Sequence, residues 1–137
     1  MSLETDTVTT IQAALVAALP STTIRWLPSD APFAPPTDAA WLQVTLLWAQ
    51  GLRHTMSPTG KNLLLGALIC NAFAPLRLDV TLAHAVMATV RDTLNRVELA
   101  GVVRFDVPRP GQPSRYDNIY WQVHSEVSLS VEEVLSG

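Results

Sequence analysis

The chain has 137 residues, the size of a single domain that buries its own hydrophobic core. Charged residues make up only 15% of it, so a disordered acidic or basic tail is excluded. The net charge is −3, which excludes the basic excess of a dedicated nucleic-acid-binding domain, and the mean hydropathy of +0.22 indicates that a partner covers some apolar surface.

The first part of the chain predicts a helix, a short strand and a stiff arm. Apolar residues recur over 8–19 at the spacing of one helix face, and Pro20 ends that helix. Residues 22–27 are a β-prone run. Residues 28–40 contain four prolines, which lack backbone donors, so we expect an extended arm. Phe33 in this arm either folds back on the core of its own chain or anchors the arm on a neighbouring subunit.

The middle of the chain predicts two strands. Residues 42–48 alternate between apolar and polar side chains, as a strand does. The polar connection that follows, 49–62, is rich in turn residues and contains Arg53 and His54. The apolar run 63–74 fits either a buried helix or a strand that is covered on both faces, and its turn-forming flanks favour the strand.

The last part of the chain predicts a helix, two strands and a second proline-rich loop. The helix starts at Asp79 or Thr81 and is followed by a strand over 103–107 and a loop over 108–118. Residues 119–131 alternate throughout, which is longer than the usual strand of about 5–6 residues, so this strand either bends or projects beyond its sheet. The buried stripe of the helix consists of Leu82, Val86, Val90 and Leu94.

These elements predict one α+β domain over residues 1–137, in which two helices pack on one face of a mostly antiparallel sheet. The single cysteine, Cys70, is expected to be a small buried side chain. The run 63–74 is the longest apolar stretch and is too short to span a bilayer, and the acidic N-terminus lacks the features of a signal peptide. We therefore expect a soluble protein, made in a reducing compartment, that does not enter a membrane.

No residue pattern predicts catalysis, a metal site or a cofactor. The histidines, His54, His84 and His124, are far apart and have no cysteine or carboxylate at metal-ligand spacing, so His84 and His124 are expected to be solvated. The tripeptide at 60–62 lacks the glycine and hydroxyl positions of a phosphate-binding loop. We therefore expect no catalytic residues, no bound metal, no cofactor and no enzymatic activity.

The candidate interaction residues are aromatic and basic side chains on the sheet surface and in loops. Trp48 and Trp121 fall on apolar strand faces and are expected in the core. Trp41 falls on the face opposite its apolar neighbours, where it can form part of a protein–protein patch. Arginine and tyrosine in loops suit interfaces, because rigid scaffolds present their binding residues on loops. The candidate interface consists of Phe33, Trp41, Arg53, His54, Arg109, Arg115 and Tyr116.

Three stretches accompany this order of elements. They are APFAPPTDAAWLQVTLL at 31–47, NAFAPL at 71–76 directly before a helix, and DNIYWQVHSEVSLSVEE at 117–133. Together, from about Ile11 to Val131, the chain resembles the tail terminator (minor tail or tail-completion) proteins of long-tailed bacteriophages. The resemblance implies a small α+β domain that assembles into a hexameric ring. The ring caps the tail tube, stops its polymerisation and presents a surface for head joining.

The same resemblance implies the partners and the location of the protein. The partners are further copies of the chain, the tail tube protein and head–tail connector proteins, while DNA passes through the ring without specific binding. The protein belongs to the virion tail of a phage or prophage and is assembled in the host bacterial cytoplasm. The family has no active site, so no catalytic residue is implied.

Two other classes of protein remain open at this point. A head–tail connector (neck) protein has a similar size and also forms rings, but it docks on portals and not on the ends of tail tubes. A small monomeric binding module is the second alternative. A measurement of the mass in solution separates this module from any ring, and the docking partner separates the two kinds of ring.

Overall fold

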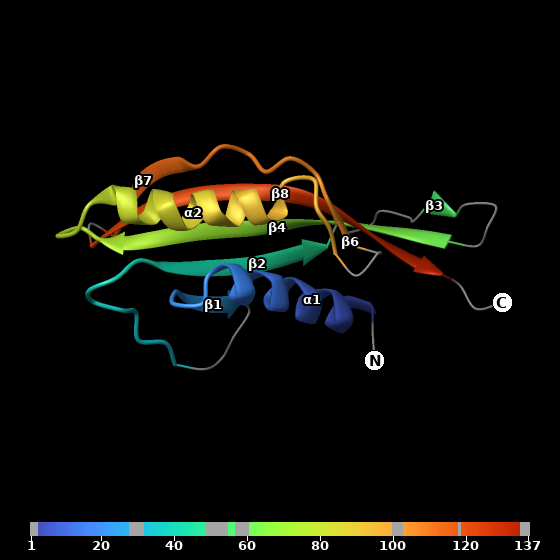
Figure 1. The fold of residues 1–137 in the computed structure, drawn as a ribbon, viewed down its shortest axis with the longest axis horizontal. Helices are drawn as coiled ribbons and strands as arrows, with labels where there is room; N and C mark the ends of the chain where they lie inside the picture. Colours follow the sequence, from blue (N-terminus) through green and yellow to red (C-terminus); the bar gives the residue numbers. More distant parts are fainter. Residues whose placement is uncertain are drawn as a thin grey trace.

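The computed structural model describes residues 3–27, 32–48, 55–56, 61–99, 103–117 and 119–134. Two helices and eight strands make up this described part of the chain (Figure 1). In chain order they are α1 (Leu3–Ala18), β1 (Thr23–Leu27), β2 (Trp41–Trp48), β3 (Thr55–Met56), β4 (Lys61–Pro75), α2 (Val80–Leu94), β5 (Glu98–Leu99), β6 (Val103–Phe105), β7 (Gln112–Tyr116) and β8 (Tyr120–Val134).

The strands form one sheet in the order β1-β2-β4-β8-β6-β5, while β3 adds to β4 and β7 adds to β8. All pairings among the described strands are antiparallel except that of β1 with β2. β1 and β2 run in parallel because a long connection, which includes residues 32–40, returns the chain to the start of β2 (Figure 1). The prediction of an α+β fold with a mostly antiparallel sheet is confirmed.

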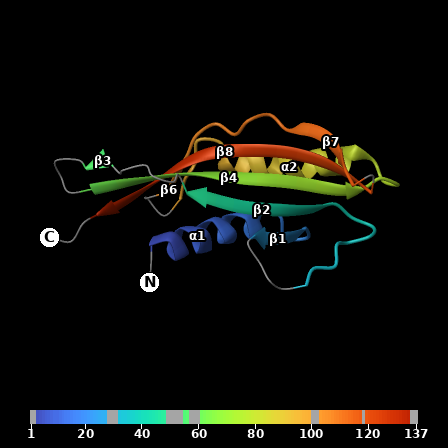
Figure 2. The same ribbon diagram turned by 180° about the vertical axis from the view of Figure 1, so that it is seen from behind.

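The longest strands, β4 and β8, pair with each other over all 15 residues of each. β2 pairs with β4 only between Gly66 and Phe73, so one end of the β4–β8 pair extends past β2. We call this end, residues 61–65 of β4 with 130–134 of β8, the ribbon. Both views show it projecting away from the helices, with β3 beside it (Figures 1 and 2). The last strand, predicted either to bend or to project beyond its sheet, stays paired with β4 along its whole length, and the two strands extend together past β2.

Both helices pack on one face of the sheet, which we call the inner face. Ile11 and Leu15 of α1 and Met87 and Leu94 of α2 are fully buried there. Alternate residues of β2, β4 and β8 form the sheet side of the same core: Leu42, Val44, Leu68, Ala72, Val123 and Val127. Since one core joins both helices to one side of the sheet, the predicted layer arrangement is confirmed.

The second helix begins where the sequence predicts, and three of the four predicted stripe residues, Val86, Val90 and Leu94, are buried. The Asp79 carboxylate accepts a hydrogen bond from the backbone N–H of Thr81 at 3.0 Å and caps the helix. Leu82, expected to be buried, is 41% exposed, whereas Ala83 and Met87 are buried. Only the first turn of the helix differs, where Ala83 and not Leu82 faces the core, because spacing alone fixes a stripe but not its exact rotation against the sheet.

The loop predicted over 108–118 contains a strand. Residues 112–116 form β7 and pair with β8, so the loop prediction is wrong over these five residues. β7 is an edge strand that pairs with β8 alone among the described strands, and such strands tolerate Pro113 because one side of their backbone needs no partner. The strand predicted over 103–107 ends at Phe105.

Cys70 lies on the inner face of β4 and is 2% exposed, so the prediction of a small buried side chain is confirmed. Burial raises the pKa of the Cys70 thiol from 9.0 to about 12, because apolar surroundings disfavour the thiolate. The thiol therefore stays protonated at neutral pH and acts as a packing residue.

A pair of truncations on α2 tests the observed rotation of this helix. Leu94→Ala should lower the free energy of unfolding by about 2–5 kcal/mol, because it opens a cavity in the core at a fully buried position. Leu82→Ala on the same helix should cost less than about 1 kcal/mol, because that side chain is 41% exposed. Urea denaturation followed by circular dichroism measures both. Equal losses in the two variants would contradict the rotation.

The thiol of Cys70 provides a test by pH. Its pKa is higher in the folded chain than the ordinary 9.0, so the unfolded state loses the proton first as the pH rises. The free energy of unfolding should therefore be unaffected below pH 9 and fall above it, by up to about 1.4 kcal/mol per pH unit. Denaturant titrations from pH 7 to 11 measure this slope, and Cys70→Ala should reduce it. An identical slope in that variant would assign the effect to other groups.

Candidate interaction surfaces

The face of the sheet opposite the helices, which we call the outer face, carries polar and aromatic side chains instead of a second aliphatic layer. Strand side chains alternate between faces, so the residues next to the buried core positions point outward. On β2, β4 and β8 the central ones are half-buried or buried. They are Trp41, Gln43, Thr45, Ile69, Asn71, Phe73, Gln122, His124 and Glu126.

An aromatic cluster covers one end of the outer face. The Trp41 ring stacks on the ring of Phe73 at a centroid distance of 4.4 Å. The Tyr120 ring meets the Trp41 ring edge-on, with the two ring centres 6.0 Å apart. The ring centre of Phe33, in the proline-rich arm, lies 4.9 Å from that of Trp41. The exposed Tyr116 meets Phe73 with the two ring centres 5.5 Å apart. The arm therefore folds back on its own chain at Phe33, the first of the two predicted possibilities.

Trp41 is 4% exposed as a result, so the expectation of an outward-facing tryptophan patch is corrected. The tryptophan does lie on the face opposite Leu42 and Val44, as predicted, but the arm and its neighbours cover it. Alternation along a strand assigns a residue to a face. It does not show whether another segment of the same chain covers that face.

A polar network runs beside the aromatic cluster. Asn71 Oδ1 accepts a hydrogen bond from Gln122 Nε2 at 2.8 Å and lies 2.7 Å from His124 Nδ1. His124, expected to be solvated, is half-buried in this network, while His84 is exposed on α2 as predicted. These three side chains stand on neighbouring strands, because Asn71 and His124 are directly opposite each other in the β4–β8 register.

The arginines of the 108–118 segment lie on different faces of β8. Arg109 forms an ion pair with Glu126 of the outer face, with Nη1 and Oε1 3.0 Å apart. The Arg115 guanidinium lies 5.0 Å from the ring centre of Trp121, which belongs to the inner side. The structure therefore does not bring these two arginines together into one contact surface. Arg53 and His54, the remaining candidates, lie outside the described residues.

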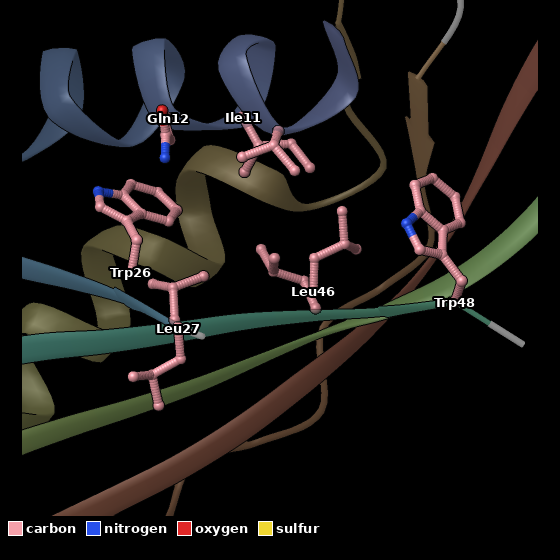
Figure 3. Close-up of a pocket in the computed structure, with 9 residues that line it drawn as sticks. Ile11, Gln12, Trp26, Leu27, Leu46 and Trp48 are labelled. Atoms are coloured by element: carbon pink, nitrogen blue, oxygen red, sulfur yellow. The ribbon is translucent and has the colours of Figure 1, made fainter. Parts of the chain in front are cut away.

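A pocket of about 220 Å³ opens on the inner side, between α1 and the strands β1 and β2 (Figure 3). Figure 3 shows Trp26 and Trp48 at its two ends with Leu46 between them, while Ile11 and Gln12 reach in from α1. None of the residues that line it carries an ionisable group. The pocket offers room for an apolar side chain but no catalytic group.

The part of the chain that the structure describes shows no group of three or more histidine, cysteine, aspartate or glutamate side chains that could hold a metal ion. None of its helices is long and apolar enough to cross a membrane. The described surfaces carry aromatic rings, side-chain amides and arginine side chains. Groups of these kinds are enriched in protein–protein interfaces.

No family model and no curated protein sequence matches the chain significantly. Solved structures do match in fold. One of them, known only by a sequence identifier, is 17% identical with a TM-score of 0.71, and the match covers 99% of each chain. Another belongs to the virion of a native gene transfer agent particle, and it is 13% identical with a TM-score of 0.61 over 91% of this chain and 93% of that chain. The chain is therefore similar in fold, over 91% of its length, to a chain of a gene transfer agent virion.

Proposed function

We propose that this chain is a structural subunit of a phage-type tail and acts as the tail terminator. In this role six copies form a ring that caps the end of the tail tube, ends its polymerisation and prepares it for joining to the head. The partners are the tail tube protein and the head–tail connector proteins. The subunit assembles in the host bacterial cytoplasm, stays in the virion tail, and performs no catalysis.

The observation that carries the proposal is the fold likeness over nearly the whole of both chains to a chain of a gene transfer agent virion. That likeness supports a role in a virion-type particle. The resemblance of three sequence stretches to tail terminators supports the particular position in the tail.

Exposed apolar side chains near the ribbon support assembly with further copies. On the outer face, Leu47 of β2 is 50% exposed and Leu65 of β4 is 38% exposed. Leu47 is opposite Ala67 in the β2–β4 register, and Leu65 is the next residue of β4 on that face. We call Leu47, Leu65 and Ala67 the ribbon base. A closed ring covers such a patch on every subunit with one repeated contact.

A double substitution at the ribbon base tests the ring. Leu47→Ser with Leu65→Ser should abolish assembly while the free energy of unfolding changes little, because both side chains are already partly exposed. Leu82→Ser is the matched control, since this exposed leucine lies on α2 near the opposite end of β4. Native mass spectrometry and light scattering measure the ring, and electron microscopy with added tail tubes shows whether it caps their ends.

Three outcomes would contradict the proposal. A chain that stays monomeric at high concentration and also with tail tubes present is a binding module and not a ring subunit. A ring that docks on portals and ignores tube ends is a connector. A double variant that still caps tubes would place the subunit contact away from the ribbon base.

DNA should pass through the ring without tight binding. The chain has 9 lysine and arginine residues against 12 aspartate and glutamate residues, so a long series of phosphate contacts is not available. Fluorescence anisotropy with a labelled duplex at physiological salt should show no saturable submicromolar binding. Submicromolar affinity for the duplex would contradict passive passage.

A further inference from the structure

A second pocket lies on the outer face, between the proline-rich arm and the strands β1, β2, β4 and β8. Its volume is about 300 Å³. The pocket contains one cation and no carboxylate. Its lining residues are Arg25, Pro35, Trp41, Gln43, Asn71, Phe73, Tyr116, Tyr120 and Gln122.

Arg25 is the cation of this pocket. It stands on β1 directly opposite Gln43 of β2, and its guanidinium lies 4.8 Å from the ring centre of Phe33. Its Nε is buried without a hydrogen-bond acceptor, and within the described residues no carboxylate pairs with this arginine. The aromatic ring holds the guanidinium in place but satisfies none of its in-plane N–H groups.

Two further sets of donors lie beside Arg25. The Trp41 indole Nε1 is buried and has no hydrogen-bond acceptor among the described residues. The Asn71 Oδ1 atom accepts from Gln122 and lies 2.7 Å from His124 Nδ1, so the amide group of Asn71 is held in place at the wall of the pocket. Buried donors without acceptors are rare in folded proteins and call for an explanation. Here two of them, Arg25 Nε and Trp41 Nε1, belong to residues that line one pocket.

We propose that this pocket binds a carboxylate, and that the carboxylate is the side chain of an aspartate or glutamate on a protein partner. A carboxylate supplies two acceptor oxygens in the geometry of a guanidinium. Entry of the group turns the Phe33 ring away from Arg25 far enough for the oxygens to reach the covered donors. The aromatic walls and the proline of the arm then contact the aliphatic part of the acidic residue.

A protein carboxylate fits this pocket better than a nucleic-acid phosphate does. The pocket has a single arginine, and the chain has a net charge of −3. A nucleic acid carries a phosphate at every nucleotide and binds best to a row of cations, which this pocket does not provide. Four aromatic side chains and a proline surround the donors, as in protein interfaces. The inference holds for any partner that presents an acidic residue, so it does not depend on the proposed role in a tail.

The test uses the indole N–H signals of the isolated, isotope-labelled chain in nuclear magnetic resonance. The chain has four tryptophans, and Trp41→Phe identifies the signal of Trp41. Sodium acetate is the first probe, with sodium chloride as the salt control. Acetate should move the Trp41 signal saturably while the other indole signals stay in place. A second pair of probes is a capped tripeptide, Gly-Glu-Gly, and its Gly-Gln-Gly counterpart, of which only the first should bind.

Variants of the arginine complete the test. Arg25→Gln should weaken acetate binding at least tenfold, and Arg25→Lys should keep part of it because the charge remains. Arg104→Gln, on β6 at the far side of the sheet, is the matched control and should leave binding unchanged. No saturable shift, equal binding by Arg25→Gln, or tighter binding of inorganic phosphate than of acetate would overturn the proposal. The binding experiment uses only the isolated chain and small probes, so its failure would not bear on the proposed assembly of the tail.

Discussion

The pairing of β4 with β8 is the interaction on which the rest of the structure depends. These two strands run side by side over 15 residues each, and every other strand except β1 and β5 pairs with one of them. Side chains alternate between faces along both strands, so this single pairing creates two surfaces of different character. Small and aliphatic residues such as Leu68, Ala72 and Val127 face the helices and form the core. Their neighbours along the chain face the other way and form the outer face, one end of which the arm covers.

The outer face shows how a sheet surface becomes organised without a second layer of helices. The arm places Phe33 over Trp41, and the stack continues to Phe73, so a short segment covers the aromatic end of the face. Prolines in the arm restrict its conformations before it docks, which lowers the entropy lost on docking. The same arm forms one wall of the pocket that contains Arg25. The packing of the arm on the sheet therefore both covers Trp41 and forms the pocket that contains Arg25.

The length of the central pair also has a consequence for assembly. β2 ends its pairing with β4 at Gly66, while β4 and β8 continue together into the ribbon. Only short strands flank the ribbon, β3 beside β4 and β6 beside β8, so it has less support from neighbouring strands than the centre of the sheet. Leu47 and Leu65 are exposed where the ribbon leaves the sheet. In the ring that we propose, a neighbouring copy packed there would remove this apolar surface from water.

The sequence by itself determined the local elements whose signals are strong and periodic. Alternation along 119–131 predicted the long last strand, Pro20 predicted the C-terminal end of the first helix, and the prolines of 28–40 predicted an extended arm. It also placed Cys70 in the core, because an apolar run around a small residue is buried in any compact fold.

The tertiary structure decided what depends on contacts between distant segments. It decided the rotation of α2 that exposes Leu82, the pairing that turned 112–116 into an edge strand, and the cover over Trp41. It also separated Arg109 from Arg115 and brought Arg25 beside Asn71 and Gln122. Residues so far apart in the chain have no common period or spacing. Only strand order and register, which long-range packing selects, bring them together.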